Sequence, residues 1–196
     1  MRISASLVAA SILALSACAD NEPVANDVNL TMNDDTALND TDLVANDAAV
    51  PAPPANFTGG DGTSLGSVAV EDSAAGLVVR MAGSGMPAGT HGLHIHMVGR
   101  CEGPKFESAG AHWNPDNKQH GRENPEGPHR GDLPNATVGA DGSLTETLTL
   151  AGVTLAELRD SDGSALVVHA QPDDNKTDPS GNSGDRIACA VIAPAG

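Results

Sequence analysis

The chain has 196 residues and a formal net charge of −16, and only 2% of its residues are aromatic. Its 22 glycines and 13 prolines argue against a coiled coil or a long-helix protein, because both residue types interrupt helices. The acidic balance argues against nucleic acid as a partner, since neutralising phosphates needs a basic surface. The one long apolar run lies at the N-terminus, which excludes a polytopic membrane protein.

Residues 1–17 have the pattern of an export signal, with Arg2 ahead of a short apolar core over 7–15. The run ends in Leu15-Ser16-Ala17-Cys18, which resembles the bacterial lipoprotein box, where the cysteine is acylated and becomes the mature N-terminus. We therefore expect Cys18 to carry lipid and to anchor the protein to a membrane. An ordinary secretory peptide that happens to contain a cysteine is the alternative. Ala19 rather than Asp follows Cys18, which favours the outer membrane, facing the periplasm, over the inner membrane.

Residues 18–55 are expected to form the lipidated cysteine and a disordered acidic linker. The 19–55 stretch holds eight acidic residues and no lysine or arginine, and it ends in Pro51-Ala52-Pro53-Pro54. Low hydrophobicity with charge of one sign predicts disorder. The folded domain is then expected over 56–196, which has nine basic and eighteen acidic residues.

From residue 55 onward, short runs rich in Val, Leu and Ile are separated by Gly and Asp, a pattern typical of β-strands. Strands are expected at 55–59, 65–71, 76–82, 92–97, 135–140, 143–149, 165–170 and 187–192. A helical turn is expected over 155–159, and Asp141-Gly142 is a hairpin turn signal. Eight short strands without interleaved helices predict an all-β antiparallel sandwich or barrel. Two long loops, 98–134 and 171–185, interrupt the pattern, and loops of that length tend to be functional.

All seven histidines lie between residues 91 and 169. His94 and His96 alternate along an expected strand, so both rings point to one face and can converge on one ion. The other candidate ligands are His169, at the end of a strand, and His112, His120, His129 and Asp132, on the first long loop. Imidazoles with a carboxylate suit zinc, and imidazole-rich sites suit copper. His91 has no partner at strand spacing, and we expect it to lie outside the metal site.

Four motifs resemble those of copper/zinc superoxide dismutases, and the resemblance spans about residues 56–194. The matching segments are Gly92-Leu93-His94-Ile95-His96, Ser108-Ala109-Gly110-Ala111-His112-Trp113-Asn114-Pro115, His129-Arg130-Gly131-Asp132-Leu133-Pro134-Asn135 and Gly181-Asn182-Ser183-Gly184-Asp185-Arg186-Ile187-Ala188-Cys189. The resemblance implies an eight-stranded antiparallel Greek-key sandwich or barrel with two long functional loops. It also implies dismutation of superoxide to dioxygen and hydrogen peroxide by a copper ion that cycles between +2 and +1.

The resemblance further implies a role for each site residue. Copper would be held by His94, His96, His112 and His169, and zinc by His112, His120, His129 and Asp132. His112 would bridge both ions and carry a proton in the reaction, while zinc tunes this bridging histidine. Asp173 matches the carboxylate that links a copper-ligand histidine to a zinc-ligand histidine. Arg186 matches the arginine that binds the anion beside the open copper position.

Three cysteines are an odd number. If Cys18 is lipidated, Cys101 and Cys189 remain as a pair, and export favours a disulfide between them. The same pair matches the family disulfide.

Three departures from the family pattern concern the site's surroundings. Trp113 replaces the usual Phe or Tyr, and Asp185 directly precedes Arg186, where an acid could weaken the local positive field. The second long loop, which corresponds to the family's steering loop, has Lys176 as its only lysine.

Two other functions compete with an exported, membrane-anchored enzyme whose substrate is the superoxide anion. A metal-binding lipoprotein of the same fold could buffer or deliver copper or zinc without catalysis, but it would not need an arginine such as Arg186. A non-catalytic adhesion sandwich explains neither the histidines nor Arg186. The sequence leaves open whether the protein forms a homodimer.

Overall fold

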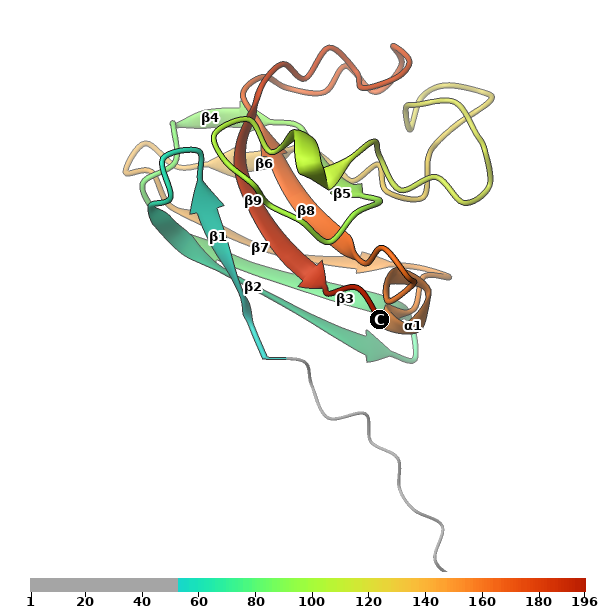
Figure 1. Cartoon of the computed structure of the whole chain (residues 1–196). Helices are drawn as coiled ribbons and strands as arrows, with labels where there is room; N and C mark the ends of the chain where they lie inside the picture. Colours follow the sequence, from blue (N-terminus) through green and yellow to red (C-terminus); the bar gives the residue numbers. More distant parts are fainter. Residues whose placement is uncertain (1–52) are drawn as a thin grey trace, which may run out of the picture. The chain divides into compact units, whose positions relative to one another are not determined.

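Figure 1 shows the computed structural model of the chain, which describes residues 53–196. The expected signal peptide, Cys18 and nearly all of the expected linker lie outside the described residues. Among the residues that are described, no helix is long and apolar enough to cross a membrane.

Residues 53–196 form nine strands and two short helical turns. In chain order the elements are β1 (Ala55–Gly59), β2 (Ser64–Ser73), β3 (Gly76–Gly83), β4 (Gly89–His91), β5 (Leu93–His96), the 3-10 turn η1 (Glu107–Ala109), β6 (Ala136–Val138), β7 (Leu144–Leu150), α1 (Leu155–Leu158), β8 (Ser164–His169) and β9 (Arg186–Ala193). All the strand pairings are antiparallel.

Seven strands form one sheet in the order β5-β8-β9-β1-β2-β3-β7, and β4 and β6 form a separate two-stranded ribbon. The ribbon connects the two ends of the sheet. Only Gly92 separates β4 from β5, and on the other side the backbone N–H of Thr137 in β6 donates to the carboxylate of Glu146 in β7 at 2.8 Å. The sheet therefore curls on itself into an antiparallel barrel (Figure 1), which confirms the predicted all-β class.

The eight expected strands agree with the observed ones to within two residues at each end. Strand β4 has no expected counterpart, because Gly89-Thr90-His91 is short and offers no apolar residue to the pattern. The Asp141-Gly142 turn does form, with the Gly139 N–H donating to the Ser143 carbonyl at 2.8 Å. However, β6 and β7 belong to different sheets, so the expected hairpin has a turn and a side-chain contact but no backbone ladder.

Gly92 is the point where the chain leaves the ribbon and enters the sheet. Its N–H donates to the Gln171 carbonyl, and its own carbonyl accepts from the His169 N–H, both at 2.8 Å. A Cβ at this position would lie 2.7 Å from the Cβ of Ser183, closer than such contacts allow. Glycine therefore lets the end of β8 and the second long loop pack against the junction of β4 and β5.

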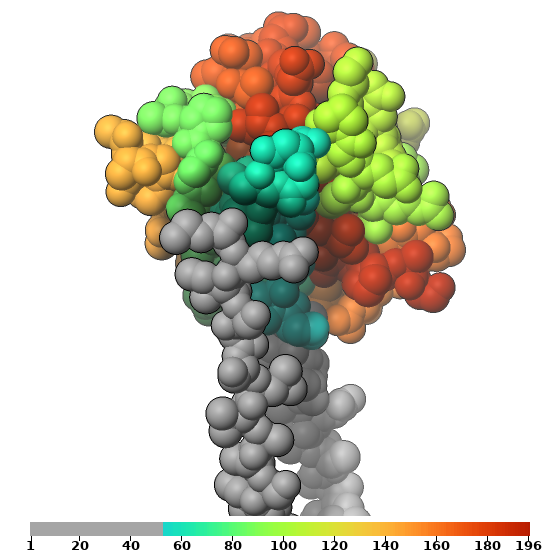
Figure 2. Space-filling model, turned by 60° about the vertical axis from the view of Figure 1, so that its left-hand side comes forward, coloured from blue at the N-terminus to red at the C-terminus, as the bar shows by residue number. Residues whose placement is uncertain are grey.

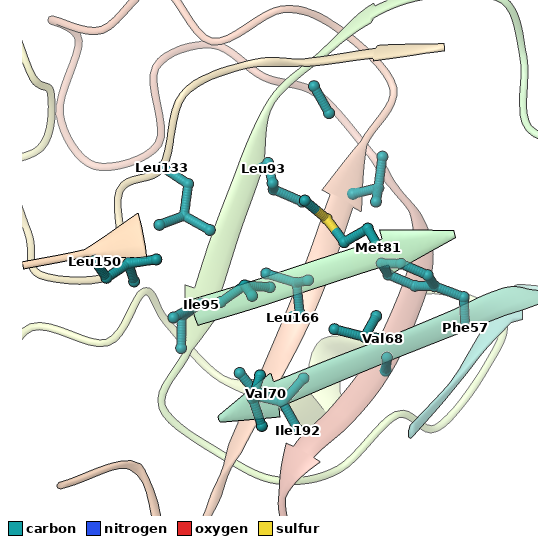
Figure 3. Packing of buried hydrophobic residues seen from close by; sticks show 14 of the residues in the cluster. Phe57, Val68, Val70, Met81, Leu93, Ile95, Leu133, Leu150, Leu166 and Ile192 are labelled. Atoms are coloured by element: carbon teal, nitrogen blue, oxygen red, sulfur yellow. The ribbon is translucent and has the colours of Figure 1, made fainter. Parts of the chain in front are cut away.

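The barrel interior is filled by aliphatic side chains from both halves of the sheet, together with Phe57 (Figure 3). Strand β3 shows how one face of each strand fills the interior, because its side chains alternate: Val79 and Met81 are buried, whereas Arg80 between them is exposed. Successive side chains of a strand point to opposite faces, so one face of β3 packs in the core and the other meets water.

Strand β8 differs because both of its faces are covered. Leu166 and Val168 pack in the barrel core, whereas Ala165 and Val167 pack in a second cluster that includes Phe106 of the first long loop. A strand that is buried on both faces has a continuous apolar sequence rather than an alternating one. The first long loop is thus part of the packing around the strand that ends in His169.

Replacing Leu166 with Ala should destabilise the domain by about 2–5 kcal/mol, because this side chain is fully buried and its removal leaves a cavity. The measurement is urea unfolding followed by circular dichroism. Leu148→Ala is the matched control, since Leu148 is only partly buried at the edge of the same core and should cost less. Equal losses for the two variants would contradict the assignment of Leu166 to the core.

Candidate metal centre

Two neighbouring strands present three histidines to one region. Strand β5 pairs with β8 so that His94 lies opposite Val167 and His96 opposite Ala165, and His169 ends β8. Together with His112 of the first long loop, these histidines form a group whose ligand atoms all lie within 4.8 Å of one another. All four side chains are buried.

The first long loop reaches this region because it pairs with the free edge of β5. His112 forms an isolated β-bridge with His96, and Asp132 forms one with His94. The Ile95 N–H donates to the Gly131 carbonyl at 2.9 Å, and the Ile95 carbonyl accepts from the Trp113 N–H at 2.8 Å. Two separate parts of the loop are thereby fixed beside the strand that carries His94 and His96.

Asp132 is the centre of a second group of side chains. Its Oδ1 lies 3.0 Å from Nδ1 of both His112 and His120 and 3.2 Å from Nδ1 of His129. Its Oδ2 accepts from the N–H groups of Gly121 and His129 at 2.9 and 3.0 Å. When the group is defined only by the distances between its ligand atoms, it contains His94, His112, His120 and Asp132. His129 is also close, because its Nδ1 lies 3.5 Å from Nδ1 of His112.

Asp173, from the second long loop, connects the two groups. Its Oδ2 lies 2.7 Å from Nε2 of His94, and its Oδ1 lies 3.1 Å from Nε2 of His120. Each ring therefore has one nitrogen occupied by the carboxylate, which fixes the ring's orientation and leaves Nδ1 available.

Three buried ring nitrogens of the first group have no hydrogen-bond partner within residues 53–196: His94 Nδ1, His96 Nε2 and His169 Nε2. Burial lowers the pKa of His96 to about 2 and that of His169 to about 3, so both rings are neutral. Unpaired polar atoms in a protein interior are costly, and a metal ion held by neutral imidazoles removes that cost. The donor set therefore fits a bound metal.

The second group holds a proton in the absence of metal. Burial opposes charge on His120, but hydrogen bonds to Asp132 and Asp173 outweigh it and raise the pKa of this ring to about 9. Burial likewise works against ionisation of the two carboxyls, yet hydrogen bonds to the histidines hold both of their pKa values well below the usual range. A cation could take the place of this proton among the same atoms.

Arg186, the first residue of β9, is half-buried beside the first group. Its Nη1 donates to the Phe106 carbonyl at 2.6 Å, and its Nη2 donates to the Gly110 carbonyl at 2.7 Å. The Gly110 carbonyl is also 2.9 Å from Nδ1 of His96. One backbone oxygen thus positions both the guanidinium and a histidine of the first group.

Two residues to which the sequence assigns no role determine where Asp173 lies: one binds its main chain, and the other leaves room for its carboxylate. The side chain of Asn135 accepts from the Asp173 N–H at 2.8 Å and donates to the Asp173 carbonyl at 2.9 Å. Gly181 has a positive φ of 63°, and a Cβ there would overlap Asp173 Oδ1. Both residues belong to the quoted motifs, so the motifs were the only sequence signal for them.

His91 lies outside both groups. Its Nδ1 is 2.8 Å from the His169 carbonyl, and its Nε2 is 2.8 Å from the Pro87 carbonyl. It is a buried structural residue that joins the ribbon strand β4 to the end of β8.

Comparison with known proteins gives one consistent result. A family model described as copper/zinc superoxide dismutase (SODC) matches residues 64–192. The chain belongs to the copper/zinc superoxide dismutase family. A relative named Superoxide dismutase [Cu-Zn] 1, from Aquifex aeolicus, is 39% identical over 137 residues, which cover 67% of this chain and 81% of the relative.

Two further matches are also bacterial. Superoxide dismutase [Cu-Zn] from Caulobacter vibrioides is 41% identical over 140 residues, covering 68% of this chain and 80% of the relative. Among solved structures, a double mutant of a SOD-like protein from Bacillus subtilis matches with a TM-score of 0.70 and 39% identity, covering 73% of this chain and 98% of that chain. The bacterial type of the superoxide dismutase family is therefore supported.

The predicted disulfide of this superoxide dismutase family member is confirmed. Cys101 and Cys189 are bonded, with their Cα atoms 5.6 Å apart. The bond ties residues 101–110, which we call the disulfide loop, to strand β9. The same segment carries Phe106 and Gly110, the two residues whose carbonyls hold Arg186.

Replacing both Cys101 and Cys189 with Ser should lower the free energy of unfolding by about 4–5 kcal/mol, because the bond closes a loop with a sequence separation of 88 residues. Urea unfolding with and without a thiol reductant measures the loss. The reductant should destabilise the wild type and leave the double variant unchanged. A similar effect of reductant on both proteins would show that the bond does not stabilise the domain.

Proposed function

We propose that the protein is a superoxide dismutase, which converts two superoxide anions and two protons into dioxygen and hydrogen peroxide. One observation carries the proposal: three buried imidazole nitrogens without a partner among residues 53–196 face one another beside the guanidinium of Arg186. Such a cluster offers a metal-binding position and, next to it, a group that binds anions.

The ligand assignment follows from which nitrogen of each ring is free. For copper we propose His94 Nδ1, His96 Nε2, His112 Nε2 and His169 Nε2. For zinc we propose Nδ1 of His112, His120 and His129 together with Asp132 Oδ1. In this assignment His112 faces both ions, since its Nδ1 lies beside Asp132 and its Nε2 is left for the first group. His94 belongs to copper alone, because Asp173 occupies its Nε2.

Side chains of the protein bind the anion and carry the proton. Bound copper supplies one-electron redox chemistry between its +2 and +1 states, with zinc as a fixed positive charge beside it. Arg186 has five N–H donors, of which two bind loop carbonyls, so the others can bind the anion. Nε2 of His112 could hold either copper or, in its place, a proton that it passes to the reduced oxygen species. Burial lowers the pKa of His112 to about 4, so the metal-free ring is neutral and its Nε2 has a lone pair that can bind a metal.

The alternative of a non-catalytic metal buffer is not favoured. It requires histidine clusters but gives no reason for Arg186 to be held by two main-chain carbonyls at their edge. The superoxide dismutase function accounts for both features.

His169→Ala should remove copper and abolish dismutation while zinc stays bound, because His169 contributes to the first group only. Metal analysis and superoxide removal by the purified, metal-loaded protein measure both effects. Gln171→Ala, an exposed position close by in the chain, is the control and should retain metal and activity. Full activity of His169→Ala in a copper-free preparation would contradict the proposed chemistry.

Asp132→Ala should have the reciprocal effect, lowering zinc content while copper still binds, because Asp132 faces only the zinc position. The control is Asp162→Ala, which removes an exposed carboxylate that belongs to neither group. Metal analysis after dialysis gives the answer. Equal loss of both metals from Asp132→Ala would mean that the ligand sets are assigned wrongly.

We also propose that the protein is exported to the periplasm and anchored to the outer membrane through lipid on Cys18. The Leu15-Ser16-Ala17-Cys18 segment supports this location, and so does the Cys101–Cys189 disulfide, since such bonds persist in oxidising compartments. More than one acyl chain on Cys18 would give stable attachment.

Cys18→Ser should abolish incorporation of labelled fatty acid and release the protein from the membrane fraction, because the acylated residue is lost. Labelling followed by fractionation measures both. Cys101→Ser is the matched control and should still incorporate label. Wild-type protein found soluble, with an N-terminus other than Cys18, would refute the anchor and leave the enzymatic proposal standing.

Whether two copies associate is a separate question. Met97 is the only large hydrophobic side chain that residues 53–196 expose, at 43%. A homodimer built on the described surface would therefore need a mainly polar interface, unlike the apolar core of most homodimer interfaces.

A further inference from the structure

Residues 53–196 contain three methionines, and water reaches the side chain of only one of them. Met97 is 43% exposed, whereas Met81 and Met86 are 2% and 3% exposed in the barrel interior. Met97 directly follows His96, the last residue of β5 and a proposed copper ligand. Since exposure decides how readily an oxidant reaches a thioether, Met97 is the most oxidisable methionine in this part of the chain.

A surface groove of about 410 Å³ connects Met97 with the candidate metal centre. The residues that line it include Met97 and its neighbour Ala111, and also His112 and His129, which we propose as metal ligands. The thioether and the proposed bridging histidine therefore meet the same solvent. A small product released beside His112 enters the groove in which Met97 is exposed.

The proposed function forms hydrogen peroxide, which oxidises a thioether without a further reactant. The sulfur attacks one peroxide oxygen, so that an S–O bond forms and the O–O bond breaks. The hydrogen of the transferred oxygen passes to the other oxygen, which leaves as water. The sulfur loses two electrons and the peroxide gains two. The product, methionine sulfoxide, is polar where the thioether was apolar.

Met97 packs against the residue that positions Arg186. A Cβ on Gly110 would lie 3.2 Å from Cγ of Met97, so this side chain lies directly against Gly110. The Gly110 carbonyl accepts from Nη2 of Arg186 at 2.7 Å and lies 2.9 Å from Nδ1 of His96. A polar group in place of the thioether therefore changes the packing of the residue that holds both the guanidinium and a proposed copper ligand.

The disulfide loop, which ends at Gly110, lies at the surface of the domain. Figure 2 shows it in yellow-green beside the red segments near the C-terminus. Its disulfide and the buried Phe106 hold its first part against the barrel. Its last part pairs with the segment that follows β5, since the Val98 N–H donates to the Ala109 carbonyl at 3.1 Å. Oxidation of Met97 thus acts at the end of the loop that binds the guanidinium.

We propose that Met97 is a modification site, oxidised to methionine sulfoxide by the hydrogen peroxide that the enzyme forms, and that the sulfoxide lowers activity by displacing the Gly110 carbonyl from Arg186. The inference rests on the proposed function for the source of the peroxide. Met97 acts through Gly110 and touches no reacting atom, so it is a regulatory site and not a catalytic residue. Methionine sulfoxide reductases reverse the modification, so the lost activity is recoverable.

The first test measures which methionine is oxidised. The metal-loaded protein is treated with hydrogen peroxide or with a stream of superoxide, each with and without catalase, and peptide mass spectrometry measures the oxygen added to each methionine. Met97 should be oxidised at least about tenfold faster than Met81 and Met86, in line with their exposed fractions of 43%, 2% and 3%, and catalase should protect it. Equal rates for the three methionines, or oxidation that persists with catalase, would overturn the modification site.

The second test measures the effect on Arg186. Oxidised wild-type protein should lose activity by about two- to tenfold, the range that corresponds to one hydrogen bond, and should regain it after treatment with methionine sulfoxide reductase. The NMR signal of the Arg186 side chain in the reduced protein should shift and return in parallel.

Met97→Leu keeps the size of the side chain without its sulfur, so it should show no activity loss that the reductase restores and no shift of the Arg186 signal. Met86→Leu is the matched control and should respond to peroxide as the wild type does, because Met86 is buried. Activity that the reductase restores equally in Met97→Leu and in the wild type would refute the link from Met97 to Arg186.

These readouts separate the inference from the proposed function. A protein that removes no superoxide, but in which added peroxide oxidises Met97 first and shifts the Arg186 signal, would refute the enzyme and support the regulatory contact. An active enzyme whose Arg186 signal and activity do not change when Met97 is oxidised would refute the inference only.

Discussion

The candidate metal centre depends on one buried carboxylate, that of Asp173. It comes from the second long loop and binds one ring on strand β5 and another on the first long loop, at 2.7 and 3.1 Å. Three segments that are distant in the sequence are thus fixed by a single side chain. Because Asp173 occupies Nε2 of both His94 and His120, only Nδ1 of each ring is left to face a metal. In the ligand sets that we propose, the fold thus selects the ligand atom of these two rings before an ion binds.

This arrangement has an energetic consequence for the metal-free protein. The buried nitrogens that have no partner in the described part of the chain reduce the stability of the fold, and a metal that binds only the native state recovers that free energy. The domain can carry this cost because the strands beneath the site are well packed. Strand β8 is buried on both faces, and the disulfide loop that covers it is bonded to β9. The packing that stabilises the barrel is also the support of the site.

The sequence predicts those features that depend on a strict period or a motif. His94 and His96 are expected to converge because strand side chains alternate, and the strand boundaries follow the apolar runs. The break at Gly92 was not predictable, since it reflects how closely Ser183 approaches from another loop. Arg186 donates its hydrogen bonds to main-chain carbonyls, which every residue has, so the sequence does not show which residues accept them. The motifs name the candidate ligands, whereas the nitrogen that each ring offers depends on tertiary contacts.

Trp113 gives the protein an optical property of its own. The chain has one tryptophan and no tyrosine, so this indole alone dominates the intrinsic fluorescence. Trp113 follows His112, and its main-chain N–H donates to the Ile95 carbonyl of strand β5. The Arg130 guanidinium lies 5.4 Å from the centroid of the indole ring. Arg130 in turn bonds Glu157 of helix α1 at 2.7 Å. The emission therefore reports on one place, where the histidine cluster meets the loop that encloses it, and does so without background from the rest of the barrel.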